Sequence, residues 1–257
     1  MKREISVDLH GRVALVTGGG RSIGESLSLA LGRNGAAVAV NYVSGERAAR
    51  ATVDAIRAAG GTAEAFKADV ADPAQVAAMF ASITTELGPV DILVNNAGIY
   101  PVTPRPSITI EEWDRVFAVN VRGSFLCVQQ AAPHMIEQSW GRIINFGSVV
   151  YHLGLEVYVH YVASKGAIVG MTRALAKDLG PHQITVNTIS PGGILTDTEL
   201  EGYPDQEARS VFFAGVQALP GRLVGDDVTG ALLYLVSDSA AYVSGQTFLV
   251  DGGWVMH

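Results

Sequence analysis

Three side chains that can take part in proton transfer stand close together in the second half of the chain: Ser148, Tyr161 and Lys165. Tyr161 and Lys165 are four residues apart on an expected helix, so their side chains share one face. A nearby ammonium group favours the phenolate and lowers the pKa of a tyrosine from its usual value of about 10. A tyrosine with a pKa brought near neutrality can act as a general acid in one direction and a general base in the other.

Ser148 follows an expected buried strand, Gly141–Gly147, and therefore emerges at the carboxyl end of that strand, where open α/β sheets bind ligands. Its hydroxyl could hold a substrate oxygen and stabilise developing alkoxide charge. Each residue alone also has an ordinary explanation, since such a serine often caps a turn, a tyrosine packs in a core and a lysine lies on the surface. Among the eight tyrosines, however, only Tyr161 has a lysine four residues later.

A glycine cluster precedes these residues by more than a hundred positions. It directly follows the apolar run Val13–Val16 and comes before an expected helix. This order is typical of dinucleotide binding, because glycines let the backbone approach a pyrophosphate and a helix N-terminus offers free N–H groups. The strict G-x-G-x-x-G spacing is not met, since Ile23 occupies the last glycine position, and an ordinary turn is the alternative for the loop alone. The expected contacts are Gly18, Arg21, Ser22, Ile23 and Gly24.

The end of the second predicted strand bears on the choice between the two nicotinamide cofactors. Folds that prefer NAD place an acid there to hold the ribose 2′-hydroxyl, but the segment from Val40 to Ser44 has none. Arg21 could instead bind a 2′-phosphate with its forked guanidinium. We therefore expect NADP(H) in preference to NAD(H), with Asn41 and Ser44 also binding the cofactor. The alternative is that Arg21 is a solvated loop charge.

Length and patterning predict the frame around these residues. A chain of 257 residues, 48% of them hydrophobic, can bury a large core as a single domain over residues 1–257. Apolar runs that alternate with amphipathic segments predict an α/β fold, a Rossmann-type doubly wound parallel sheet. The predicted strands are Val13–Val16, Ala37–Val40, Ile92–Val94, Arg142–Asn145, Ile184–Ile189 and Thr247–Val250, and the predicted helices are Glu46–Ala59, Pro73–Leu87, Glu111–Glu137 and Tyr161–Leu179. The third of these helices begins with a sequence typical of a capping box, Thr109 to Glu112.

Charge and cysteine usage exclude several classes of protein. A net charge of −7 argues against nucleic acids and anionic membranes as partners. The single cysteine, Cys127, fits a reducing compartment. The first residues contain no apolar segment typical of a signal peptide, and no apolar run is long enough for a membrane helix. We therefore expect a cytoplasmic protein. His152 and His160 lack a third partner at ligand spacing, so no metal site is predicted.

These features together resemble the short-chain dehydrogenase/reductase family over Gly11 to Gly253. The motifs that match are Thr17-Gly18-x3-Ser22-Ile23-Gly24, Asp69-Val70, Asn95-Asn96-Ala97-Gly98, Asn120, the trio Ser148, Tyr161 and Lys165, Pro191-Gly192-Gly193-Ile194-Leu195-Thr196, and Val250-Asp251-Gly252-Gly253. The resemblance implies that Asp69 and Val70 touch the adenine and that Asn96, Ala97 and Gly98 line the cofactor. It places Pro191, Gly192, Ile194 and Thr196 beside the nicotinamide carboxamide.

The resemblance also implies a reaction, the interconversion of a ketone and a secondary alcohol with NADP(H). Tyr161 would exchange a proton with the substrate oxygen, which Ser148 holds. Lys165 would bind the cofactor's ribose hydroxyls and tune Tyr161, and Asn120 would hold a water that relays the proton.

Two departures from the family pattern matter. Ser22 stands where the family usually has glycine; at a helix start serine is favourable, so we expect altered phosphate contacts rather than lost binding. The similar 3-oxoacyl-[acyl-carrier-protein] reductases carry arginines where this chain has Gln138-Ser139-Trp140 and Pro181-His182-Gln183. With an acidic chain as well, docking of an acidic carrier is electrostatically poor. That activity stays the alternative. The complete catalytic set argues against a non-catalytic protein, and the chain length against an epimerase.

The substrate must be selected by three variable segments, Ile99–Pro106, Val149–His160 and Thr198–Arg222. An aromatic and apolar wall suits a hydrophobic or cyclic ketone, although some of these rings will pack the lid instead. The candidates are Tyr100, Tyr151, His152, Tyr158, His160, Tyr203, Phe212 and Phe213. The apolar helix Glu111–Glu137 and the tail Trp254 to His257, together with the habit of the resembled family, predict a homotetramer.

Overall fold

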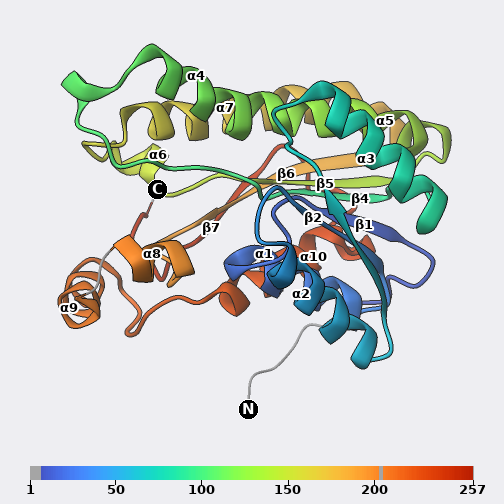
Figure 1. Ribbon diagram of the computed structural model, residues 1–257, viewed down its shortest axis with the longest axis horizontal. Helices are drawn as coiled ribbons and strands as arrows, with labels where there is room; N and C mark the ends of the chain where they lie inside the picture. The colour runs from blue at the N-terminus through green and yellow to red at the C-terminus, as the bar shows by residue number, and fades with distance from the viewer. Residues whose placement is uncertain (1–6, 203–204, 257) are drawn as a thin grey trace.

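The computed structural model describes residues 7–202 and 205–256. Within them, seven parallel strands form one sheet in the order β3-β2-β1-β4-β5-β6-β7 (Figure 1). The strands are β1 (Val13–Val16), β2 (Ala37–Tyr42), β3 (Thr62–Lys67), β4 (Ile92–Asn95), β5 (Gly141–Phe146), β6 (Ile184–Pro191) and β7 (Thr247–Val250).

The centre of the sheet is fully apolar, as burial on both faces requires. Leu15 of β1 pairs with Ala39 of β2 on one side and Leu93 of β4 on the other, and all three are inaccessible to solvent. From β1 the chain builds the sheet toward β3, and from β4 it continues in the opposite direction toward β7. The loops after β1 and β4 therefore lead away to opposite sides, and the crevice between them is the place where open α/β sheets bind ligands.

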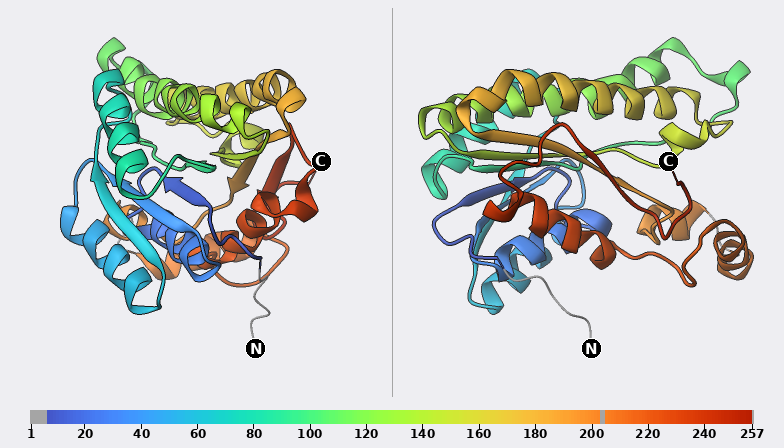
Figure 2. Two further views of the ribbon diagram at one scale, coloured as in Figure 1. Left: turned by 90° about the vertical axis from the view of Figure 1, so that its right-hand side faces the viewer. Right: turned by 180° about the vertical axis from the view of Figure 1, so that it is seen from behind.

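Helices cover both faces of the sheet, each burying an apolar stripe (Figures 1 and 2). One face carries α1 (Ser22–Arg33), α2 (Glu46–Ala58) and α10 (Thr229–Val236). The other carries α3 (Pro73–Glu86), α5 (Gly123–Glu137) and α7 (Val159–Leu179). The remaining helices are α4 (Ile110–Phe117), α6 (Val150–Leu153), α8 (Asp197–Gly202) and α9 (Gln206–Val216), and the short helical turns are η1 (Arg105–Ser107), η3 (Gly180–His182), η4 (Gly225–Val228) and η5 (Asp238–Ala240).

The predicted fold class is confirmed, and all six predicted strands are present. The prediction missed β3, in which only Ala63 and Phe66 are buried, because this edge strand does not show the continuous apolar run of the inner strands. The predicted helix Glu111–Glu137 is divided into α4, a π-helical segment η2 (Ala118–Arg122) and α5. The three segments follow one another without a break, so the sequence contains no turn signal at which the predicted helix would be divided.

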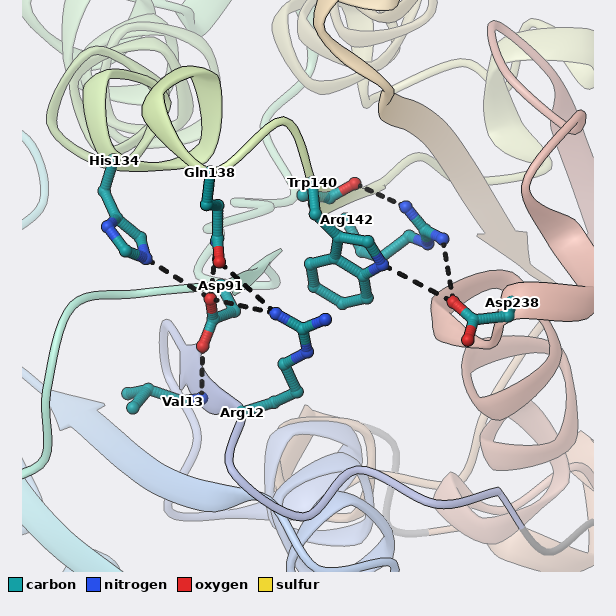
Figure 3. A network of polar contacts seen from close by, with 9 residues as sticks. Arg12, Val13, Asp91, His134, Gln138, Trp140, Arg142 and Asp238 are labelled. Atoms are coloured by element: carbon teal, nitrogen blue, oxygen red, sulfur yellow. Dashed lines mark hydrogen bonds and ion pairs between the residues drawn. The ribbon is translucent and has the colours of Figure 1, made fainter.

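A polar network fastens the amino-terminal edge of the sheet (Figure 3). The carboxylate of Asp91, just before β4, accepts from the backbone of Val13 at 2.8 Å and from the Gln138 amide at 2.6 Å. The Trp140 ring lies between two guanidinium groups, with that of Arg12 3.7 Å and that of Arg142 4.4 Å from its centroid. These contacts join β1, β4, β5 and α5 at the edge opposite the carboxyl ends of the strands.

Among the residues that the structure describes, no helix combines the length and the apolar character needed to cross a bilayer.

Candidate active site

Two adjoining cavities open at the carboxyl ends of the central strands, with volumes of about 330 and 580 Å³. The smaller one lies over the loops that follow β1, β2, β3 and β4. The larger one lies beside the ends of β5 and β6 and the start of α7. Ile23, Tyr100 and Thr196 line both cavities. A ligand that fills the first can therefore extend toward the second.

Two asparagines hold the glycine loop in place. Gly18 has a φ of +61°, a left-handed conformation that suits glycine. Its N–H donates to the Asn41 side-chain oxygen at 3.2 Å, and its carbonyl accepts from the Asn96 amide at 3.2 Å. The loop is thus tied on one side to β2 and on the other to the segment after β4. This arrangement leaves the start of α1 pointing into the smaller cavity.

Asn41, which is expected to bind the cofactor, also has a structural role. Asn41 is buried, and its amide group donates to the carbonyl of Ala68 at 3.0 Å and that of Phe66 at 3.3 Å while its oxygen accepts from Gly18. Although Asn41 borders the cavity, its side chain serves to shape the loop. A strand-end asparagine gives no signal in the sequence that separates these two roles.

Gly24 lets the start of α1 pack closely against Gly18, although the glycines do not have the usual G-x-G-x-x-G spacing. A Cβ atom at Gly24 would lie 2.0 Å from the carbonyl oxygen of Gly18, so no larger residue fits. The position that must be glycine is therefore Gly24, one residue after the last position of the G-x-G-x-x-G pattern, which Ile23 occupies. The loop therefore keeps the geometry of a phosphate cradle despite its departure from the usual spacing.

Ser22 does not act as the favourable helix-starting residue that we expected. It has a φ of +49°, a conformation that costs a non-glycine residue roughly 1 kcal/mol, and the start of α1 has no side-chain cap. Its hydroxyl instead donates to the Asp197 carboxylate at 2.9 Å and lies 3.3 Å from the Asp197 N–H. Ser22 therefore links the glycine loop to the first residue of α8.

The other predicted cofactor residues lie around the same two cavities. Asp69 accepts from the Arg115 guanidinium at 3.1 Å, so α4 also contributes to the wall of the smaller cavity. Arg21 borders this cavity with an exposed side chain. The smaller cavity is lined by Gly18, Arg21, Ser22, Ile23, Gly24, Ser44, Asp69, Val70, Asn96, Ala97, Gly98 and Thr196, and the larger by Pro191, Gly192, Ile194 and Thr196.

Ser148 and Tyr161 face the larger cavity, and Lys165 lies behind them. Ser148 follows β5, and Tyr161 lies in the first turn of α7, one helical turn before Lys165. The Lys165 ammonium is buried; it donates to the carbonyl of Phe146 at 2.7 Å and lies 5.5 Å from the centroid of the Tyr161 ring. The sheet and α7 thus bring the three predicted residues together.

The acid–base balance of this group differs from the expectation. Burial raises the pKa of Tyr161 to about 12, and a hydrogen bond with Ser148 only partly opposes this effect. Burial likewise lowers the pKa of Lys165 to about 8. In the protein alone the pKa of Tyr161 is therefore raised where we expected it to be lowered, and the first cause of the shift in both groups is the removal of charge from water.

Asn120 lies in the π-helical segment η2, a type of distortion that is frequent at functional sites. Its side-chain oxygen accepts from the Ile99 N–H at 2.9 Å, and its amide donates to the Ile99 carbonyl at 2.9 Å and to the Ser164 hydroxyl at 3.0 Å. The side chain therefore joins the loop after β4 to α7. Both amide hydrogens of Asn120 are used in these contacts, whereas its side-chain oxygen can accept one further hydrogen bond.

The aromatic wall predicted for the substrate is partly present. Tyr100 and Tyr158 lie on either side of Tyr161, with ring centroids 5.7 and 6.2 Å from its own, and Phe213 forms part of the far wall. Tyr151 and Phe212 are substantially exposed and do not line the cavity, and His160 is completely buried elsewhere. His152 is also outside the cavity lining, and Tyr203 lies outside the described residues.

Sequence reasoning missed the charged end of the larger cavity. Glu199 and Arg209 line it, and the Glu199 carboxylate accepts from Arg209 at 3.0 Å and from Arg222 at 2.7 Å. Both guanidinium groups also lie over the Phe213 ring. Trp254, predicted only as part of an interface, completes this end. Glu199, Arg209 and Arg222 have no regular spacing in the sequence, so no motif indicates that they meet.

Comparison with known proteins gives a consistent result. A family model described as enoyl-(acyl carrier protein) reductase matches residues 18–255. A 3-oxoacyl-[acyl-carrier-protein] reductase of Staphylococcus aureus is 38% identical, over 95% of this chain and 98% of its own. A short-chain type dehydrogenase/reductase of Picea abies is 39% identical, over 96% of this chain and 93% of its own. The crystal structure of a short-chain type dehydrogenase/reductase from Mycobacterium marinum superposes with a TM-score of 0.87 at 36% identity, covering 97% of each chain.

The buried ammonium of Lys165 predicts an unusual stability profile. Below pH 8 this charged form destabilises the folded state, and the penalty fades between pH 8 and 10.5 because the folded protein then releases a proton that the unfolded chain still binds. Lys165→Met should therefore raise the free energy of unfolding at pH 7 by about 2 kcal/mol, the charge penalty less the lost bond to Phe146. The gain should disappear as the pH approaches 10.5.

Denaturant unfolding between pH 6.5 and 10 measures this difference. Lys177→Met, which removes an exposed lysine from the same helix, is the matched control and should show no comparable gain. A Lys165→Met protein that is less stable than the wild type at pH 7 contradicts the prediction.

Proposed function

Because the chain belongs to the short-chain dehydrogenase/reductase family, we propose that it interconverts a ketone and a secondary alcohol with NADP(H), using Tyr161 as general acid and base. The observation that carries the proposal is the hydrogen-bonded pair of Ser148 and Tyr161 on the wall of the larger cavity, next to the phosphate cradle of the smaller one. The pair offers two hydroxyl groups to one ligand oxygen at the place where the cavities meet.

The residues around the smaller cavity fit a dinucleotide. Gly18 and Gly24 keep the backbone close, and the start of α1 has N–H groups without a side-chain cap. Asn96, Ala97 and Gly98 would line the middle of the bound cofactor, and Asp69 and Val70 its adenine end. When bound, the nicotinamide supplies or accepts the hydride.

The tyrosine performs the proton step. In the direction of reduction, Tyr161 enters the reaction protonated, in line with its raised pKa, and gives its proton to the ketone oxygen while Ser148 holds that oxygen with a second hydrogen bond. Lys165 stands beside the phenol and stabilises the negative charge that the lost proton leaves. Asn120 keeps α7 and the loop after β4 together around the reacting atoms.

NADP(H) is favoured by the charges near the adenosine end. The loop after β2 offers Ser44 at the cavity and has no carboxylate that would repel a 2′-phosphate. Asp69, the acid after β3, already has Arg115 as a partner. Arg21 is the exposed cation that can reach a phosphate from the glycine loop.

The larger cavity favours a hydrophobic or cyclic ketone. Its wall beside Tyr161 consists of Tyr100, Tyr158, Val149 and Leu155, so a flat apolar body can pack there. The Glu199 and Arg209 pair at the other end suits a polar group distant from the ketone.

A second candidate is the reduction of a 3-oxoacyl group on acyl carrier protein, which the 38% identity to the Staphylococcus aureus enzyme supports. The positions that carry docking arginines in such reductases argue against it. Gln138 is engaged with Asp91, and Trp140 is packed between Arg12 and Arg142 at the amino-terminal edge of the sheet (Figure 3). Arg142 itself is buried, so it offers no surface charge to an acidic carrier.

We also propose that the protein acts in the cytoplasm as a homotetramer. The exposed Phe125 and Ile136 on α5 offer an apolar surface that a second copy would cover.

Burial raises the pKa of the Cys127 thiol to about 12, so this single cysteine is protected from oxidation rather than available for a disulfide.

Tyr161→Phe tests the catalytic assignment. Because the variant keeps the ring and loses only the hydroxyl, turnover should fall by about 10²–10⁴-fold, the usual contribution of general acid–base catalysis. Binding of NADPH, followed by its fluorescence, should change little. Tyr151→Phe, at an exposed tyrosine outside the cavity, is the control. A Tyr161→Phe enzyme with ordinary turnover refutes the assignment.

Arg21→Ala tests the cofactor assignment. Removal of the guanidinium should weaken NADPH binding about tenfold, as expected for a charge-assisted contact with phosphate. NADH lacks that phosphate, so its binding should hardly change. The measurement is the dissociation constant of each cofactor at two ionic strengths, with Arg33→Ala at the other end of α1 as control. Equal weakening for both cofactors contradicts recognition of a 2′-phosphate.

A substrate panel separates the two candidate reactions. Initial rates of NADPH oxidation, with NADH in parallel, are compared for acetoacetyl thioesters and for aryl and cyclic ketones. We expect higher kcat/KM for the free ketones, because the wall beside Tyr161 is apolar and Gln138-Ser139-Trp140 and Pro181-His182-Gln183 stand where the carrier-protein reductases have docking arginines. A clear preference for the thioesters identifies the carrier-protein reaction instead.

A further inference from the structure

His160, the residue directly before Tyr161, is completely buried, and both nitrogen atoms of its ring have partners. Nδ1 lies 3.0 Å from the backbone nitrogen of Tyr161, and Nε2 lies 2.9 Å from a carboxylate oxygen of Glu112 on α4. A ring in this position connects a neighbouring helix to the main chain of the proposed general acid. His160 does not line either cavity, so it does not touch the substrate or the cofactor.

The two contacts assign the tautomer of the ring. A backbone N–H can only donate, so Nδ1 of His160 must accept from Tyr161. In the neutral ring the hydrogen is then on Nε2, which donates to the Glu112 carboxylate. The carboxylate thereby keeps Nδ1 free of a proton and available to Tyr161.

The start of α7 explains why Tyr161 needs this partner. The first bond within the helix runs from the Val162 N–H to the Tyr158 carbonyl, at 2.8 Å, so the N–H of Tyr161 has no backbone acceptor in its own helix. Tyr158, at the N-cap, supplies no side-chain cap. The ring of His160 takes the place of that cap.

The carbonyl of Tyr161 is held as well. It accepts from the Ser164 hydroxyl at 2.7 Å, and Ser164 in turn accepts from the Asn120 amide at 3.0 Å. The peptide groups on both sides of the Tyr161 Cα atom are therefore connected to one helical rod, through Glu112 of α4 and Asn120 of η2. The direction of the phenol depends on the placement of that Cα atom.

Glu112 has an obvious alternative role at the start of α4. Its own N–H is capped by the Thr109 hydroxyl at 3.1 Å, as the predicted capping box requires, but its carboxylate contacts His160 across the helix interface. The local sequence pattern thus concealed a contact with the site.

We propose that Glu112 and His160 are positioning residues that set the place of the Tyr161 hydroxyl relative to the substrate oxygen. The inference rests on the proposed function only in that Tyr161 must be the proton donor. A small displacement of such a group can lower a rate by as much as about 10²-fold, so the pair should affect kcat more than the binding of substrate or cofactor.

Two substitutions of His160 divide its contacts. In His160→Asn, the side-chain oxygen replaces Nδ1 and can accept from Tyr161, but the shorter side chain does not reach Glu112. In His160→Gln, the longer amide can donate to Glu112 but leaves the Tyr161 N–H without its acceptor. We expect His160→Gln to lower kcat about tenfold or more, with KM and NADPH affinity within about twofold of wild type. His160→Asn should lower kcat only several-fold, because it keeps the acceptor for Tyr161 and loses only the contact with Glu112. Equal kcat for the two variants overturns the proposal.

Glu112 provides an independent pair of variants on another helix. Glu112→Gln keeps an oxygen that can accept from Nε2, and it should stay close to wild type in kcat. Glu112→Ala removes the acceptor and should lower kcat several-fold. Glu111→Ala, which deletes an exposed carboxylate from the same turn of α4, is the matched control. If Glu112→Ala behaves like Glu111→Ala, the carboxylate has no positioning role.

Amide hydrogen exchange separates this proposal from the proposed function. The Tyr161 amide should exchange faster in His160→Gln than in His160→Asn, whatever the enzyme acts upon, because only the first removes its acceptor. Unchanged exchange at Tyr161 in both variants overturns the positioning contact. If the Tyr161 amide exchanges faster in His160→Gln but the wild-type protein reduces no ketone, the positioning contact stands and the proposed reaction is refuted.

Discussion

The site depends on keeping a phenol and an ammonium group away from bulk water. Lys165 is buried with the Phe146 carbonyl as its polar partner, and the balance of burial leaves Tyr161 protonated and Lys165 easy to deprotonate. Both pKa values differ from those of an exposed pair, because burial disfavours the charged form of each group. At the end of β5, the Phe146 carbonyl and the Ser148 hydroxyl supply the hydrogen bonds that water would otherwise make to Lys165 and Tyr161. The phenol keeps its proton until a charge or a developing oxyanion in the cavity changes this balance.

One helical rod meets most of the positional demands of the site. The α4–η2–α5 rod contacts α7 through Glu112 and Asn120, and it reaches the loop after β4 through the backbone of Ile99. Its π-helical segment places Asn120 between these two elements. A regular helix would shift the register of every following residue, including Gly123, whose missing Cβ allows contact with Val70 at the end of the smaller cavity. The distortion thus affects both the contact with α7 and the wall of the smaller cavity.

Much of this arrangement could be predicted because its signals are local. Buried strands appear as apolar runs, and the spacing of Tyr161 and Lys165 on a helix places them on one face. The missed features depend on partners distant in sequence. Asn41 became a loop-shaping residue through its contact with Gly18, and Glu199 became part of the cavity through Arg209 and Arg222. The strand β3 was missed because a sheet edge does not demand a continuous apolar sequence.

Ser22 shows how one such distant contact changes the meaning of a local departure. A glycine would adopt a φ of +49° without strain, whereas serine bears a cost of roughly 1 kcal/mol. Unlike glycine, however, serine has a hydroxyl, which donates to the Asp197 carboxylate and accepts from the Asp197 N–H. Two hydrogen bonds of ordinary net strength are enough to offset the strain. Breaking that contact leaves the strained backbone uncompensated. The conformation of the glycine loop and the position of α8 are therefore energetically linked, and both of them border the junction of the two cavities.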